Sequence, residues 1–132
     1  MAGWSDSLAT GIKEVDNQHK EIFRRVDELL AACKDGKGRE KVGETIDFLG
    51  GYVIKHFEAE EKIQRDYKFP HYPEHKAMHE QFIKDFSKLK EQFDKDGATL
   101  PLVMSMNRTV VAWLVNHIER EDKRIAMHIK AA

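Results

Sequence analysis

Apolar residues recur along most of this chain at alternating steps of three and four positions, and strict two-residue alternation does not persist. Steps of three and four place apolar side chains on one face of an α-helix. Three stretches rich in glycine, proline or charged residues interrupt the pattern, at 34–38, 67–73 and 94–101. The chain is therefore predicted to be all-α, with four long amphipathic helices and short connections.

Four such helices favour an up-down-up-down antiparallel four-helix bundle, and a single domain is expected over 1–132. The apolar stripes that would form its core are, in chain order, Ile22, Val26, Leu29, Leu30 and Cys33; Val42, Ile46, Leu49 and Val53; Met78, Phe82, Phe86, Leu89 and Phe93; and Val103, Met106, Val110, Leu114, Ile118 and Ile125.

The start of the first helix is predicted from a capping residue. Asp16 is of a type that often caps a helix N-terminus, so the bundle is expected to occupy 16–132. Residues 1–15 are too few and too interrupted by glycine for a fifth core helix, and they are predicted to form an N-terminal arm across the bundle. Gly50-Gly51 inside the second helix would cost about 1 kcal/mol each relative to alanine. Close helix packing or a local kink would account for them.

Length and charge narrow the class of protein. The 132 residues include 22 Lys and Arg against 23 Asp and Glu, a net charge of −1, and 41% are apolar. A near-neutral chain without a basic tract offers no electrostatic surface for nucleic acid. No apolar run is long enough for membrane insertion, and the N-terminus lacks the features of a secretory signal, so a cytoplasmic protein is expected. Cys33, the single cysteine, cannot form an internal disulfide.

Seven histidines stand out, and most of them interrupt the apolar stripes. The polar residues on the predicted inward faces are His19, His56, Glu60, His75, His79 and His117. His56 and Glu60 are four positions apart, as are His75 and His79, so each pair shares one helical face. These residues lie early in the first and third helices and late in the second and fourth. An up-down bundle would therefore gather them at one end.

If this cluster is buried, its polar atoms need hydrogen-bond partners or a bound ligand. A lone histidine on an apolar face is usually a satisfied core residue, but each unpaired buried polar group costs about 1–3 kcal/mol. A metal centre would satisfy the whole cluster together. Imidazole and carboxylate donors without paired cysteines suit iron, copper, zinc or manganese. Five histidines exceed what one tetrahedral zinc ion holds, so two metal ions are predicted.

Four motifs occur in order along the chain. They are Trp4…Leu8…Gly11-Ile12…Val15-Asp16-x-Gln18-His19, His56-Phe57-x-x-Glu60, Tyr72-Pro73-x-His75-x-x-x-His79 and Trp113-Leu114-x-x-His117-Ile118-x-x-x-Asp122. With these spacings the chain resembles a hemerythrin, and its N-terminal part is similar to that of the single-domain bacteriohemerythrins. The resemblance spans nearly the whole chain.

The resemblance implies a non-haem di-iron centre that binds O2 reversibly. The implied ligands are His75, His79 and His117 for one iron, His19 and His56 for the other, and Glu60 and Asp122 as carboxylate bridges beside an oxo or hydroxo bridge. By ligand count, the iron with two histidines keeps an open position, where O2 is expected to bind. Leu114 and Ile118 are implied to form the apolar wall of the O2 pocket.

Asp122 is the ligand on which helix geometry and the resemblance disagree. At 100° per residue, Glu121 points closer to the middle of the fourth stripe, while His117 and Asp122 flank it on opposite sides. The five-residue step from His117 to Asp122 is the family's pattern, so Asp122 is preferred as the ligand. Glu121 is expected in solvent or behind the ligands. His71 and His128 match no family ligand and are expected to be ordinary surface residues.

The leading functional prediction is a binding protein, not an enzyme, that transports, stores or delivers O2 and returns it unchanged. The alternatives are an O2 or redox sensor that works with a separate partner, a di-iron oxidase or peroxidase, and a structural bundle that holds zinc or nothing. A histidine-rich site that excludes water argues against turnover. An oxygen-consuming client protein is a candidate partner, and the oligomeric state is left open.

Overall fold

The computed structural model describes residues 4–35 and 39–131, nearly all of them helical. A short 3-10 turn, η1 (Asp6–Leu8), precedes three long helices, α1 (Lys13–Lys34), α2 (Arg39–Asp66) and α3 (Tyr72–Asp96). The fourth rod is one continuous helix of varying winding, made of α4 (Leu100–Met106), the π-helical η2 (Asn107–Ala112), α5 (Trp113–His117), the π-helical η3 (Ile118–Asp122) and α6 (Lys123–Ala131). No strand occurs in these ranges, and none of their helices combines the length and apolarity that a membrane crossing needs.

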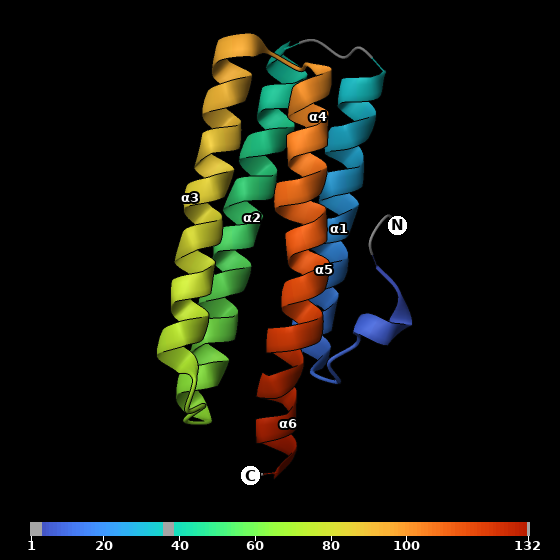
Figure 1. Cartoon of the computed structure of the whole chain (residues 1–132). Helices are drawn as coiled ribbons and strands as arrows, with labels where there is room; N and C mark the ends of the chain where they lie inside the picture. Colours follow the sequence, from blue (N-terminus) through green and yellow to red (C-terminus); the bar gives the residue numbers. More distant parts are fainter. Residues whose placement is uncertain (1–3, 36–38, 132) are drawn as a thin grey trace.

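The four rods form a closed ring of neighbours. Helix α1 packs against α2, α2 against α3, α3 against α4 and η2, and η2 back against α1. Figure 1 shows the rods running alternately in opposite directions. The predicted all-α, up-down-up-down four-helix bundle is therefore confirmed.

The predicted apolar stripes meet along the axis of this bundle. Most of their members are buried, including Ile22, Leu49 and Phe82, which are almost inaccessible to solvent. Four predicted core residues, Leu30, Cys33, Met78 and Val103, are only partly buried. Three of these, Leu30, Cys33 and Val103, line an open apolar groove between α1 and α4.

Helix α1 begins at Lys13, so the prediction that Asp16 caps it is wrong, and the N-terminal arm ends at Ile12 instead of residue 15. The Asp16 carboxylate turns back toward the arm. It accepts hydrogen bonds from the Thr10 amide (2.8 Å), the Thr10 hydroxyl (2.7 Å) and the Gly11 amide (3.1 Å). Gly11 has φ +88°, a conformation that glycine adopts without strain. Asp16 therefore fastens the arm rather than starting the helix.

The arm lies against the bundle, beside α1 in Figure 1. Leu8 inserts into the hydrophobic core and is 3% exposed. Lys123, at the start of α6, donates a hydrogen bond from Nζ to the Ser7 carbonyl over 2.6 Å. The arm is thus held by one apolar anchor and by polar contacts to both α1 and the fourth rod.

Gly50 and Gly51 lie inside α2, which continues through both without a break. A Cβ atom at Gly50 would lie 2.9 Å from Cε1 of Phe86, whereas one at Gly51 would meet nothing within 4 Å. Close packing of α2 on α3 therefore accounts for Gly50, and no kink is needed.

Candidate metal centre

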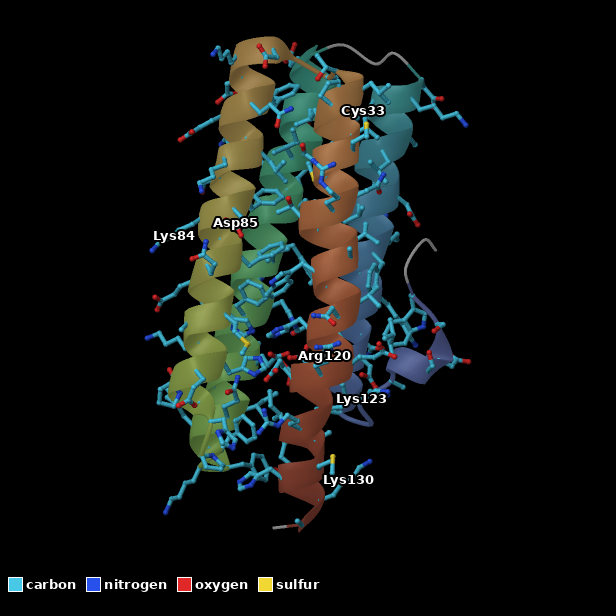
Figure 2. All side chains as sticks on the ribbon, in the orientation of Figure 1. Cys33, Lys84, Asp85, Arg120, Lys123 and Lys130 are labelled. Carbon is cyan, nitrogen blue, oxygen red and sulfur yellow. The ribbon has the colours of Figure 1, made fainter. Side chains whose placement is uncertain are left out.

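The seven residues predicted as metal ligands lie together inside the bundle. They come from the start of α1, the end of α2, the start of α3 and the α5–η3 part of the fourth rod, which share the lower half of Figure 1. Arg120 and Lys123, labelled in Figure 2, mark this level on the fourth rod. None of the seven is more than 4% exposed: His19, His56, Glu60, His75, His79, His117 and Asp122.

Their ligand atoms form two groups that share both carboxylates. The three-histidine group consists of His75, His79 and His117, and the two-histidine group consists of His19 and His56. Glu60 and Asp122 belong to both, and within each group all ligand atoms lie within 4.8 Å of one another. Nε2 of His75 and Nε2 of His117 are 3.0 Å apart, a close approach of two ring nitrogens that fits convergence on one ion.

The shared carboxylates present one oxygen to each group. Oε1 of Glu60 lies 2.8 Å from Nε2 of His75 and 3.2 Å from Nε2 of His79, while its Oε2 lies 3.4 Å from Nε2 of His56. Oδ1 of Asp122 lies 3.1 Å from Nε2 of His75, while its Oδ2 lies 3.1 Å from Nε2 of His19. A carboxylate that offers its two oxygens to two clusters of imidazoles is arranged to bridge two ions.

Several polar atoms at this centre have no hydrogen-bond partner within the described part of the chain. On the side of the ligand atoms they are Nε2 of His19, Nε2 of His79, Oε2 of Glu60 and both carboxylate oxygens of Asp122; Nδ1 of His19 and Nδ1 of His75 are unpartnered as well. Buried polar groups in proteins are almost always satisfied. Lone pairs of imidazole and carboxylate that point at a common centre, without donors to share, fit divalent metal ions of the iron, zinc or manganese kind.

The winding of the fourth rod explains why Asp122 joins the centre. In η3 the hydrogen bonds follow the π-helical pattern, which spans five residues instead of four. His117 and Asp122 are five positions apart and therefore come to the same side, with Nε2 of His117 and Oδ1 of Asp122 at 3.2 Å. Glu121 lies outside this cluster, with its side chain 24% exposed and 3.5 Å from Arg124. The structure therefore places Asp122, and not Glu121, beside the histidines, as the five-residue spacing predicts.

Two side chains outside the cluster accept hydrogen bonds from the ring nitrogens that face away from Glu60 and Asp122. Nδ1 of His56 donates to Oε1 of Gln18 over 2.6 Å, and Nδ1 of His79 donates to Oε2 of Glu61 over 3.0 Å. Gln18 belongs to the first sequence motif, but the motifs give neither Gln18 nor Glu61 a role. Each lies next to a predicted ligand in the sequence, Gln18 before His19 and Glu61 after Glu60. This proximity does not predict a contact, because adjacent residues on a helix point in different directions.

Aromatic rings support the three-histidine group. The Phe57 ring stacks on His79, with centroids 3.8 Å apart and planes 4° from parallel. Trp113 stacks on His117 at 4.4 Å and 11°. Leu114 and Ile118 flank His117 in the chain and are 3% and 0% exposed, so the predicted pocket residues are buried beside a predicted ligand.

Charges in the cluster shift the ionisation of its members. Burial raises the pKa of Glu60, but contacts with His56, His75 and His79 outweigh it and hold that pKa well below its usual range. Burial and the nearby Glu60 charge also raise the pKa of Asp122, yet its histidine contacts lower it overall. Burial lowers the pKa of His75, but Asp122 and Glu60 raise it to about 9. Both carboxylates are therefore ionised at neutral pH.

His71 and His128 lie outside the centre. His71 is exposed and immediately precedes α3, in agreement with a surface position. His128 is partly buried, and its Nε2 donates to the carbonyl oxygen of Tyr67 over 2.8 Å. His128 therefore lies at the surface, as predicted, and its contact links α6 to the connection between α2 and α3.

Comparisons with known proteins point in the same direction as the geometry. Residues 10–129 match the family model described as the hemerythrin HHE cation binding domain. The chain is 34% identical to the bacteriohemerythrin of Pseudomonas paraeruginosa, over 90% of this chain and 75% of that protein. It is 32% identical to the bacteriohemerythrin of Methylococcus capsulatus, over 93% and 92%. A solved wild-type hemerythrin structure is similar with a TM-score of 0.83 and 30% identity, over 96% of this chain and 95% of that one.

Proposed function

This chain belongs to the hemerythrin family, and from that premise we propose that it binds O2 reversibly at a non-haem di-iron centre. One observation carries the proposal: Glu60 and Asp122 each offer one oxygen to the three-histidine group and the other to the two-histidine group. Histidine and carboxylate donors of this kind suit iron. Two bridged ions explain why both carboxylates are buried between the groups.

Each residue of the centre has a separate task in this proposal. His75, His79 and His117 would hold one iron, and His19 and His56 would hold the other. When bound, the two irons would supply the electrons that O2 takes up as it binds. His19 and His56 offer one imidazole fewer than the three-histidine group, so an iron held there would have room for O2.

Leu114 and Ile118 would form the apolar wall beside the bound gas. Their burial next to His117 supports this role. An apolar wall excludes the water and protons that would otherwise release reduced oxygen and leave the irons oxidised. These side chains would therefore protect the reversible reaction without contacting a metal.

We further propose that the protein is not an enzyme and that it transports, stores or delivers O2 in the cytoplasm. A histidine-rich centre enclosed by apolar residues favours the return of O2 unchanged over turnover of a substrate. An oxygen-consuming protein would be the natural client. Sensing of O2 through a separate partner uses the same binding step and is the second candidate.

The experiment is an optical spectrum of the iron-loaded, anaerobically reduced protein, recorded again after addition of O2 and once more after the gas is removed with argon. We expect a visible charge-transfer band that appears with O2 and disappears under argon. Two irons per chain should accompany the band. Glu121→Ala, which lies outside the cluster, serves as the control and should behave like the wild type.

Irreversible conversion to a ferric spectrum would contradict reversible binding. If peroxide or an oxidised substrate accumulates in that case, a di-iron oxidase or peroxidase becomes the better assignment. If the chain binds zinc and no iron under the same loading conditions, the centre is structural.

A further inference from the structure

One histidine of each group has a side-chain hydrogen-bond partner behind its ring, and these two partners differ in charge. In the three-histidine group, Nδ1 of His79 donates to the carboxylate of Glu61. In the two-histidine group, Nδ1 of His56 donates to the side-chain amide oxygen of Gln18. The two partners have nearly the same shape, but one is an acid and the other is neutral.

Both partners fix their imidazole in the form that a metal needs. Nε2 of His79 faces Glu60 at 3.2 Å and Nε2 of His56 faces it at 3.4 Å, so Nε2 is the metal-facing atom in both rings. The proton then resides on Nδ1, where a carboxylate or an amide oxygen accepts it. Such contacts fix the tautomer and the orientation of a metal-binding histidine.

The charge of the partner changes how strongly the imidazole donates electrons. A carboxylate draws the Nδ1 proton toward itself, which makes the far nitrogen more basic, and a neutral amide does so less. The Glu61 side chain is only 15% exposed, so solvent screens this contact poorly. The Phe57 ring, stacked on His79, covers one face of the imidazole and keeps it in place.

We propose that Glu61 and Gln18 are positioning residues that add to the difference between the two metal positions already given by three and two histidines. Glu61 strengthens His79 as a ligand, so the three-histidine position binds its ion more tightly. Gln18 leaves His56 a weaker ligand, so the two-histidine position keeps a lower affinity and a coordination sphere that opens more readily. This inference rests on the proposed metal centre, but it does not depend on O2 binding.

The test uses the full-length, metal-free chain titrated with Co2+ alone under anaerobic conditions, followed by calorimetry and visible absorption. We expect the wild type to bind two ions in a tighter and a weaker step. Glu61→Gln should weaken the tighter step about ten-fold, the lower end of the usual effect of such partners. Gln18→Glu should strengthen the weaker step while leaving the tighter one unchanged.

Two further variants separate the role of these contacts from general effects of charge. Glu58→Gln removes an exposed negative charge from the same helix, one turn away, and should leave both steps unchanged. The double variant Glu61→Gln with Gln18→Glu keeps the net charge of the wild type. It should narrow or reverse the difference between the two affinities, whereas a net-charge effect would leave that difference unaltered.

A spectroscopic measurement assigns the effect to the ring. In the cobalt-loaded protein, the paramagnetic ion shifts the exchangeable Nδ1 protons of its histidine ligands far outside the normal range. Glu61→Gln should move the signal of His79 and leave that of His56 in place. A variant that had merely lost packing would broaden or move all of these signals together.

The outcomes distinguish this inference from the function on which it rests. If the wild type binds two cobalt ions and Glu61→Gln changes neither step, or if Glu58→Gln has the same effect, the role of Glu61 is overturned. If the wild type binds no cobalt, the metal centre falls and the inference falls with it. If cobalt binding follows the expected pattern but the iron-loaded protein does not bind O2 reversibly, only the proposed function is overturned.

Discussion

Burial and charge act in opposite directions on Glu60 and Asp122. A carboxylate removed from water would normally take up a proton. Here the surrounding imidazoles hold the pKa of each carboxyl below its usual range, and the two negative charges persist inside the core. Two divalent ions would balance these charges better than protonated histidines, since an ion satisfies several lone pairs at once. The same arrangement that is costly in a metal-free bundle is therefore stabilising in a metal-loaded one.

Substitution of Asp122 tests which carboxylate of the fourth rod holds metal. Asp122→Ala removes one of the two shared carboxylates, so we expect the protein to lose most of its iron. Glu121→Ala removes a side chain that faces Arg124 and should retain two irons per chain. Iron and protein are measured together by elemental analysis after anaerobic loading. Loss of iron in Glu121→Ala with retention in Asp122→Ala would reverse the assignment.

Leu114 offers a test of the apolar wall. Leu114→Ala should speed oxidation of the O2-bound protein several-fold, because water gains access to the centre, while the iron content stays the same. Leu102→Ala is the matched control, since Leu102 is equally buried on the same rod but lies near its other end. Both substitutions should cost about 2–5 kcal/mol of stability. Decay of the visible band in air is the measurement, and equal rates in the two variants would remove Leu114 from the wall.

At the level of elements, the fourth rod shows what periodicity can predict. Its apolar stripe predicts one long helix, because the positions of buried residues follow the average number of residues per turn over the whole rod. The π-helical η3 adds one residue to a turn, and a single extra residue is invisible in a pattern of three- and four-residue steps. Ideal geometry therefore favoured Glu121, and only the spacing of a known family pointed to Asp122.

The contacts of side chains on the flank of a helix could not be predicted from the sequence either. Gln18 and Glu61 lie beside the apolar stripes, where polar side chains usually face water, and only the packing of neighbouring rods brings them to His56 and His79. The sequence predicts a helix cap at Asp16 because residues that cap a helix and residues that hold a loop share the same chemistry. By contrast, the five histidines and Glu60 could be placed from the sequence, since each interrupts an apolar stripe.

The contact between α2 and α3 yields a prediction from two adjacent glycines. Gly50→Ala would place a methyl group against the buried ring of Phe86, and we expect a loss of about 1–2 kcal/mol. Gly51→Ala meets no neighbour and should instead gain up to about 1 kcal/mol from higher helix propensity. Urea unfolding of the metal-free protein measures both. Equal effects of the two substitutions would show that α2 and α3 separate easily at Gly50.

For the whole molecule, the antiparallel order of the rods is what makes a centre from scattered residues. Helices α1 and α3 contribute side chains near their starts, while α2 and the fourth rod contribute side chains near their ends. Each contribution alone would be a buried polar residue in an amphipathic helix. Together they form a cluster whose effect on stability depends on whether protons or metal ions occupy it. Metal binding and the free energy of unfolding should therefore both depend on pH.

Removal of metal should change the sign of the pH dependence of stability. In the metal-free protein, Asp122 and Glu60 raise the pKa of His75 to about 9, against an ordinary value of 6.5. The stabilisation from charged His75 is then complete below pH 6.5 and is lost as the pH rises toward 9. Burial lowers the pKa of His19, but contacts with Asp122 raise it overall, so His19 acts in the same direction as His75. Burial lowers the pKa of His56, so His56 reduces the stability only as the pH falls through this lowered pKa.

The metal-loaded protein should behave in the opposite way, because an imidazole must lose its proton to bind metal. We expect the free energy of unfolding of the chelated protein to fall between pH 6 and pH 9. The loaded protein should instead lose metal and stability as the pH drops below about 6, where free imidazole takes up a proton. Urea unfolding across this range, with and without a chelator, gives both curves. Parallel curves would mean that the buried histidines do not exchange protons for metal. The assignment of a metal centre to Glu60, Asp122 and the neighbouring imidazoles would then be wrong.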